Sequence, residues 1–162
     1  RFSGENSSFA AHGLRLAEAA ARGDAPGMSK VLEPLLRNYV SVRDTASRAP
    51  AENYYHGFLS ALFACAGSRI NDFRSNSESG DGYADIVFSS GYSTERVGIV
   101  IEIKRASRPE GLLDSVNSAL KQIDEKDYAE CFRRMRCSKY YAYGIAFCGK
   151  QCEVGGGKLR DI

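Results

Sequence analysis

A length of 162 residues, with 43% hydrophobic and 26% charged residues, allows one domain with a substantial core and excludes fibrous and disordered classes. The net charge of +2 is too small to identify a partner. Apolar runs such as VGIVIEI are far shorter than a membrane span, so we expect no membrane association.

Five cysteines at irregular spacing favour free thiols, and hence a reducing, cytoplasmic compartment. Cys148 and Cys152 could form half of a zinc site, but the chain offers no second ligand pair, and His12 and His56 are isolated. We therefore expect no zinc centre, and we interpret His56 as a packing or capping residue.

Two helical patterns open the chain and predict an N-terminal helical hairpin at about residues 7–44. Ser7 or Ser8 is a candidate cap for the first helix, which we expect to end near Gly23. The second helix has an apolar stripe, with Pro34 expected in or near its first turn. The stripe consists of Val31, Leu32, Leu35, Leu36 and Tyr39.

The remainder, about residues 48–154, predicts an α/β core. A broad apolar face in residues 50–67 indicates a helix, and residues 109–135 indicate another that breaks near Asp127. Strands are predicted at 68–75, 82–90 and 96–106 and in two segments of 139–154. We expect a single domain over residues 1–162, cut from a longer protein, because the chain begins with Arg1 and stops after a glycine run.

Three charged residues lie within the apolar strands: Asp85, Glu102 and Lys104. Side chains alternate along a strand, so Glu102 and Lys104 share one face. The spacing between Asp85 and Glu102 is sufficient for a strand, a turn and a return strand. The pattern therefore predicts that Asp85 lies beside Glu102 in the sheet.

Two desolvated carboxylates side by side are costly unless a cation or a proton offsets their charge. We therefore expect Mg²⁺ or Mn²⁺, bound by Asp85, Glu102 and the backbone carbonyl of Ile103. Lys104 could hold an attacking water or stabilise charge that grows on a phosphate. The alternative is a salt bridge among the three charged residues that only fixes strand register.

Five blocks of sequence, in order from residue 52 to residue 154, resemble the PD-(D/E)XK nuclease superfamily, in particular its bacterial branch that is often found behind an AAA-type ATPase-like region. The blocks are ENYYHGFLSALF, SNSESGDGYADIVF, IVIEIKRA, ALKQIDEKDYA and YGIAFCGKQCEV. The resemblance implies a restriction-endonuclease-like core, a mixed sheet flanked by helices, and metal-dependent cleavage of nucleic-acid phosphodiesters.

The resemblance also implies roles for individual residues. Asp85 matches the metal-binding aspartate of the family, and Glu102 and Lys104 match its ExK motif. Glu52 matches the acidic residue at the start of the first core helix, and we expect it to ligate a second metal or to hold a metal-bound water. Gln122 matches a glutamine that follows the sheet in related nucleases. Glu52 and Gln122 also have simpler interpretations, as a helix-end charge and a solvated helix residue.

Tyr128, Lys126 and Lys150 are the candidate nucleic-acid contacts. Tyr128 belongs with Gln122 to a glutamine and tyrosine motif of related nucleases, although core packing is its simpler interpretation. Lys126 lies in a basic part of the chain, and Lys150 could touch a phosphate or be only a turn residue. The stretch GYAD departs from relatives that often carry an arginine close to the motif aspartate.

The expected function is a Mg²⁺-dependent nuclease, a hydrolase for which DNA is the favoured substrate and RNA the alternative. The alternative is a catalytically inactive module that keeps the nuclease fold and binds nucleic acid or a protein partner. The intact set of Asp85, Glu102 and Lys104 favours catalysis, whereas the modest net charge favours the binding module slightly. An ATPase-like region or other domains are expected in the full-length protein.

Overall fold

A five-stranded mixed sheet forms the centre of the molecule, described here by a computed structural model. The structure describes residues 3–41, 51–79, 82–91 and 95–162, and the side chains of residues 9–41, 53–75, 85–91 and 95–162. The strands lie in the order β1 (Asn71–Ser79), β2 (Gly82–Ser90), β3 (Val97–Arg105), β4 (Lys139–Cys148) and β5 (Gln151–Asp161). β3 and β4 pair in parallel, and the other neighbouring strands pair antiparallel.

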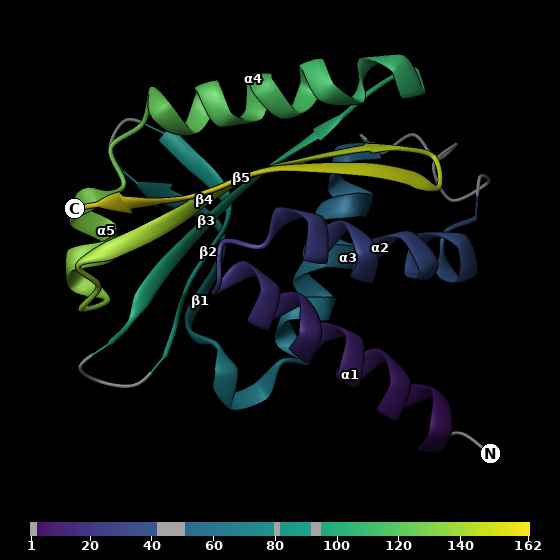
Figure 1. Cartoon of the computed structure of the whole chain (residues 1–162), viewed down its shortest axis with the longest axis horizontal. Helices are drawn as coiled ribbons and strands as arrows, with labels where there is room; N and C mark the ends of the chain where they lie inside the picture. Colours follow the sequence, from purple (N-terminus) through teal and green to yellow (C-terminus); the bar gives the residue numbers. More distant parts are fainter. Residues whose placement is uncertain (1–2, 42–50, 80–81, 92–94) are drawn as a thin grey trace.

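Helices flank both faces of the sheet, as expected (Figure 1). One side carries α1 (Ser3–Ala20), α2 (Ala25–Tyr39) and α3 (Ala51–Ala64), and the other carries α4 (Leu112–Asp124) and α5 (Ala129–Arg134). The short turns η2 (Gly67–Arg69) and η3 (Pro109–Gly111) precede β1 and α4. The chain between β3 and β4 runs through α4 and α5, which form the crossover that a parallel pair requires.

In the described ranges no helix combines the length and apolar character needed to cross a membrane.

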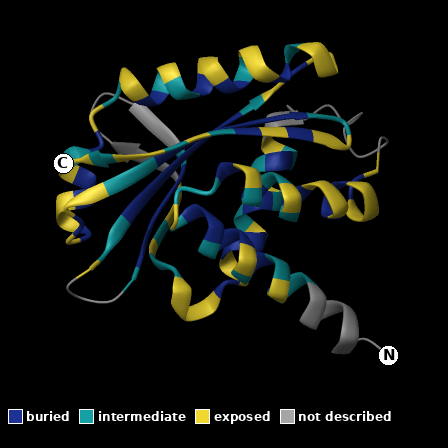
Figure 2. Cartoon of the chain, in the orientation of Figure 1, coloured by how far each residue is buried: buried dark blue, intermediate teal, exposed yellow. Residues whose placement is uncertain are grey.

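β3 is buried on both faces, which explains its nearly unbroken apolar sequence. Ile101 and Ile103 face the core beneath α1, α2 and α3, whereas Val100 faces a second core beneath α4 and α5. Figure 2 shows the resulting band of buried residues along the central strands. Glu102 and Lys104 share the face of Val100, so both charged residues lie on the α4 side of the sheet.

The N-terminal hairpin is present, but both of its helices begin earlier than the sequence predicts. α1 already includes Ser7 and Ser8, so neither residue caps it. α2 begins at Ala25, which places Pro34 inside the helix and Pro26 in the first turn. The expectation that Pro34 lies in or near the first turn is therefore wrong.

Local hydrogen bonds and turns shift the starts of α2 and β1. The Asp24 carboxylate accepts a hydrogen bond from the Gly27 N–H at 2.9 Å and thereby caps α2. The strand expected at residues 68–75 begins later, because η2 occupies the preceding turn and β1 starts at Asn71.

β5 continues beyond residue 154, the expected end of the core, and reaches Asp161. The three glycines of the terminal run lie inside this strand, where its register against β4 shifts. Gly156 has a φ of +101° and Gly157 a φ of +86°, a conformation that residues with a side chain rarely adopt. The glycine run is therefore an irregularity of the strand and is part of the sheet.

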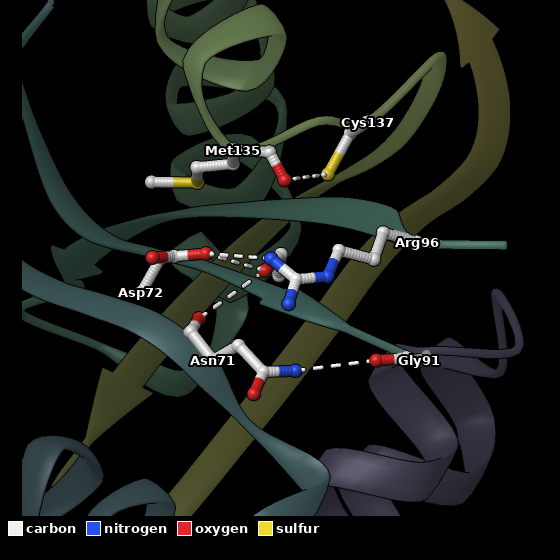
Figure 3. A network of polar contacts seen from close by, with 7 residues as sticks. Asn71, Asp72, Gly91, Arg96, Met135 and Cys137 are labelled. Atoms are coloured by element: carbon white, nitrogen blue, oxygen red, sulfur yellow. Dashed lines mark hydrogen bonds and ion pairs between the residues drawn. The ribbon is translucent and has the colours of Figure 1, made fainter. Parts of the chain in front are cut away.

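A polar network ties the first three strands together where β2 ends and β3 begins (Figure 3). Asp72, with a φ of +53°, accepts hydrogen bonds at Oδ2 from Ser89 Oγ and Arg96 Nη1, each at 3.2 Å. Asn71 Nδ2 donates to the Gly91 carbonyl at 3.2 Å. The backbone pairing of β2 with β3 extends from this fixed end toward the charged residues.

Gly144 of β4 allows α4 to lie close to the sheet. A Cβ at this position would lie 2.6 Å from the Val116 carbonyl oxygen and 3.0 Å from the Ala119 Cβ, both in α4. We predict that Gly144→Ala displaces α4 and lowers the free energy of unfolding by about 1–3 kcal/mol, as expected for overpacking. Urea unfolding followed by circular dichroism measures this change.

Gly57 of α3 provides the matched control, because a Cβ there would meet no atom within 4 Å. Gly57→Ala should raise the free energy of unfolding by up to about 1 kcal/mol, since alanine is the better helix former. A similar effect of the two substitutions would contradict the packing role assigned to Gly144.

Candidate active site

The backbone pairing of β2 with β3 ends at Ile86 and Ile101, and a carboxylate follows at the next position on each strand. Extending the register by one residue sets Asp85 opposite Glu102, on the face toward α4. Asp85 Oδ2 accepts a hydrogen bond from the Ile103 N–H at 2.7 Å. A side chain of β2 therefore binds a backbone group of β3 beyond the last strand pair, and this bond holds Asp85 beside Glu102.

Glu102 is 3% exposed, and polar groups from α4, β3 and the segment after α4 surround its carboxylate. Gln122 of α4 donates from Nε2 to Oε1, and the Lys104 ammonium lies 3.7 Å from the same oxygen. Lys126 Nζ lies 3.8 Å from Oε2. Oε2 accepts no hydrogen bond from the residues that the structure describes, so this buried oxygen is incompletely satisfied.

Burial and, to a lesser extent, repulsion from Asp85 raise the pKa of Glu102 from 4.5 to about 7. The ammonium groups of Lys126 and Lys104 act in the opposite direction, because each favours the ionised carboxylate. Two carboxylates and two ammonium groups thus share the site. With these two ammonium groups and without a bound metal ion, Glu102 loses its proton near pH 7.

Gln122 links Glu102 to Lys104. Its Oε1 accepts a hydrogen bond from Lys104 Nζ at 2.6 Å, while its Nε2 donates to Glu102. An amide can make both bonds because it carries a donor and an acceptor, whereas an ammonium group only donates and a carboxylate only accepts. From the sequence, Gln122 was a candidate only by family resemblance, and the structure places it in direct contact with the charged pair.

Lys126 lies inside the site. It follows Gln122 by one helical turn, just beyond the end of α4, and its side chain is 14% exposed. The sequence predicts a nucleic-acid contact at this position, but in the structure the ammonium faces Glu102. The four-residue spacing from Gln122 is the signal that could have indicated this location, because residues one turn apart share a helix face.

Tyr128 and Lys150, the other expected nucleic-acid contacts, lie in different environments. Tyr128 is 1% exposed, which contradicts a direct surface contact because its ring packs in the core. Its hydroxyl is buried without a hydrogen-bond partner in the described part of the chain, and burial, followed by the charges of Glu102 and Asp85, raises its pKa. Lys150 lies in the exposed turn between β4 and β5, where its ammonium donates to the Arg37 carbonyl at 3.1 Å.

α3 reaches the site through His56. His56 Nε2 lies 2.9 Å from the Asp85 carbonyl oxygen and 2.9 Å from Ser75 Oγ. A carbonyl can only accept, so His56 carries a proton on Nε2 and donates it to Asp85. The sequence suggested only packing or capping for His56, because no local pattern identifies a bond to a distant backbone. Glu52 lies one turn earlier in α3, and its side chain is outside the described residues.

The oxygen atoms at this site fit a divalent ion such as Mg²⁺ or Mn²⁺. Asp85 and Glu102 offer carboxylates, and the carbonyl of Ile103 points to the same side of β3 as its N–H, which faces Asp85. Hard oxygen ligands completed by water are the usual surroundings of Mg²⁺. Among the described side chains no group of three or more His, Cys, Asp or Glu could hold a metal, and the five cysteines are free thiols.

We predict that Glu102→Gln stabilises the metal-free protein at alkaline pH. Between pH 4.5 and about 7 the unfolded chain releases the Glu102 proton while the folded protein retains it, so wild-type stability falls as the pH rises. At pH 8 the glutamine variant should gain up to about 3 kcal/mol over the wild type, because its side chain is neutral in both states.

Thermal unfolding in EDTA at pH 8 and pH 4.5 measures this difference. The two proteins should differ at pH 8 and converge at pH 4.5, where the carboxyl is largely protonated in the folded protein. A wild type that is the more stable protein at pH 8 would show that ionised Glu102 is not a destabilising group.

The comparison with protein families agrees with this geometry. Residues 50–156 match the family model described as the PD-(D/E)XK nuclease superfamily. The matched region includes Asp85, Glu102, Lys104 and Gln122, which the fold brings together. No curated protein matches the chain. Because the match covers more than half of the residues, the chain belongs to the PD-(D/E)XK nuclease superfamily.

Proposed function

We propose that this protein is a metal-dependent nuclease that hydrolyses phosphodiester bonds, with DNA as its substrate. The observation that carries the proposal is the buried Glu102, set opposite Asp85 and sharing its strand face with Lys104. A buried cluster of charges contributes little to stability, because the desolvation penalty offsets the attraction. A catalytic site that must hold a cation accounts for such a cluster better than a structural role does.

Asp85, Glu102 and the Ile103 carbonyl are the residues that would hold Mg²⁺ or Mn²⁺. When bound, the ion would supply Lewis-acid stabilisation of the charge that develops on the scissile phosphate. The protein restrains these oxygens in advance, since the Ile103 N–H binds Asp85 and Gln122 binds Glu102. Restrained ligands need less reorganisation when a cation or substrate arrives.

Lys104 is the proposed catalytic residue that contacts the reacting groups. Its side chain is 27% exposed, so the ammonium can face solvent while it remains bound to Gln122. An ammonium group at this point can orient the attacking water or offset negative charge on the phosphate. Gln122 is a positioning residue, because it acts on the reaction through Lys104 and Glu102.

Membership of the nuclease superfamily supports a nucleic-acid substrate, and RNA is the alternative to the DNA that we propose. Lys150 remains a candidate phosphate contact, because it lies in an exposed turn. This turn follows the carboxyl end of β4, which is at the same edge of the sheet as the end of β3 that carries Lys104. A nucleic acid bound along this edge would pass near the proposed site.

Cleavage assays on linear, circular and single-stranded DNA and on RNA, each with Mg²⁺, Mn²⁺ or EDTA, test the function. We predict cleavage of DNA that requires the divalent ion. Lys104→Met should reduce the rate by at least about a hundredfold, because a charged group that stabilises the transition state is lost. Circular dichroism should show that the fold is retained.

Lys121→Met is the matched control, because Lys121 is an exposed α4 lysine whose ammonium lies 3.8 Å from Glu125. This variant should cleave at the wild-type rate. Nucleic-acid binding without cleavage under every condition would instead identify an inactive binding module. Full activity of Lys104→Met would remove Lys104 from the mechanism.

Glu52 is proposed as a further carboxylate of the site, either as a ligand or as a residue that holds a metal-bound water. It lies one helical turn before His56, whose ring binds the Asp85 carbonyl, so the two positions are on the same face of α3. We predict that Glu52→Gln weakens cleavage by at least about tenfold, equivalent to about 1.4 kcal/mol, with little change in melting temperature. Unchanged cleavage across a Mg²⁺ titration would leave Glu52 as a helix-end charge.

A further inference from the structure

Lys126 has a position that the proposed reaction does not explain. Catalysis as proposed uses one lysine, Lys104, whose ammonium is hydrogen-bonded to Gln122. Lys126 is a second lysine of the site, and its ammonium lies 3.8 Å from the other carboxylate oxygen of Glu102. We infer that Lys126 is a built-in counter-cation of Glu102, which stabilises the metal-free site and opposes the binding of a divalent ion.

The ion pair of Lys126 and Glu102 is buried, and burial strengthens the attraction between the two charges. The side chain of Glu102 is 4% exposed and that of Lys126 is 14% exposed, so little solvent screens the two charges. By contrast, the exposed pair of Lys121 and Glu125 on α4 has the same separation of 3.8 Å but side chains 78% and 64% exposed. The same distance therefore corresponds to a strong interaction at the site and a weak one on the helix surface.

The oxygen that Lys126 faces is also one that a cation would use. Glu102 Oε1 accepts a hydrogen bond from Gln122, whereas Oε2 accepts none from the described residues. An ion that joins Asp85 and Glu102 would bring two positive charges next to the Lys126 ammonium. Like charges at this separation repel, so the ion must either displace the lysine or bind less tightly because of it.

This inference rests on the proposed function, because it assigns Asp85 and Glu102 to a divalent ion. It also reconciles the buried position of Lys126 with a nucleic-acid contact. A lysine displaced from Glu102 by the ion could donate to a phosphate of a substrate bound at this site. Ion binding and phosphate binding would then favour one another through Lys126.

Calorimetric titration of Mn²⁺ at pH 8 into the wild type, Lys126→Met and Lys121→Met tests the inference. Methionine keeps much of the length of lysine and removes its charge. Lys126→Met should bind Mn²⁺ at least about tenfold more tightly than the wild type, because a competing cation is lost. Lys121→Met should bind as the wild type does. An unchanged or weaker affinity of Lys126→Met would overturn the inference while leaving a metal-binding wild type consistent with the proposed function.

A double-mutant cycle in EDTA tests the counter-cation without any metal. Lys126→Met should lower the melting temperature by about 2–4 °C in the wild-type background, for a coupling of about one kcal/mol in a protein of this size. In the Glu102→Gln background the same substitution should have little effect. Equal shifts in both backgrounds would overturn the inference, whereas the absence of Mn²⁺ binding in every variant would overturn the proposed metal site instead.

Discussion

The separation of β2 from β3 beyond the pair Ile86 and Ile101 is the constraint on which the site depends. A continued ladder would next use the backbone N–H and carbonyl of Ile103, two residues beyond Ile101. Instead, the Asp85 carboxylate binds the Ile103 N–H, and the neighbouring carbonyl and carboxylates face a common space. The network around Asp72 fixes the strands at the other end of their pairing, so the two carboxylates are placed by the sheet itself.

The site also depends on how closely α4 approaches the sheet. Gly144 leaves room for the backbone of α4, and this close packing lets Gln122 reach both Glu102 and Lys104. Lys126 follows one turn later, and its ammonium faces the second carboxylate oxygen of Glu102. Core packing and site electrostatics are therefore coupled, because a helix that moved outward would withdraw the amide and an ammonium group from the buried carboxylate.

Simple periodicity predicted the parts of this structure that depend on local sequence. The strand alternation placed Glu102 beside Lys104 and opposite Asp85, and the apolar stripes located α2, α3 and α4. The resemblance supplied Gln122, which periodicity alone could not distinguish from a solvated helix residue. The inward position of Lys126 was indicated only by its four-residue spacing from Gln122. The bond from His56 to Asp85 depends on how distant elements pack, so no local pattern contained it. The glycines of β5 were misread because their conformation is set by pairing with β4.

The most direct test of this account is the location of Mn²⁺ in crystals grown at pH 8 with the ion, measured as an anomalous difference peak. The account predicts a peak coordinated by Asp85 and Glu102, adjacent to the Ile103 carbonyl, with the Lys126 ammonium farther from Glu102 than the present 3.8 Å. A map without a peak between the two carboxylates, in crystals where Lys126 still faces Glu102, would contradict it.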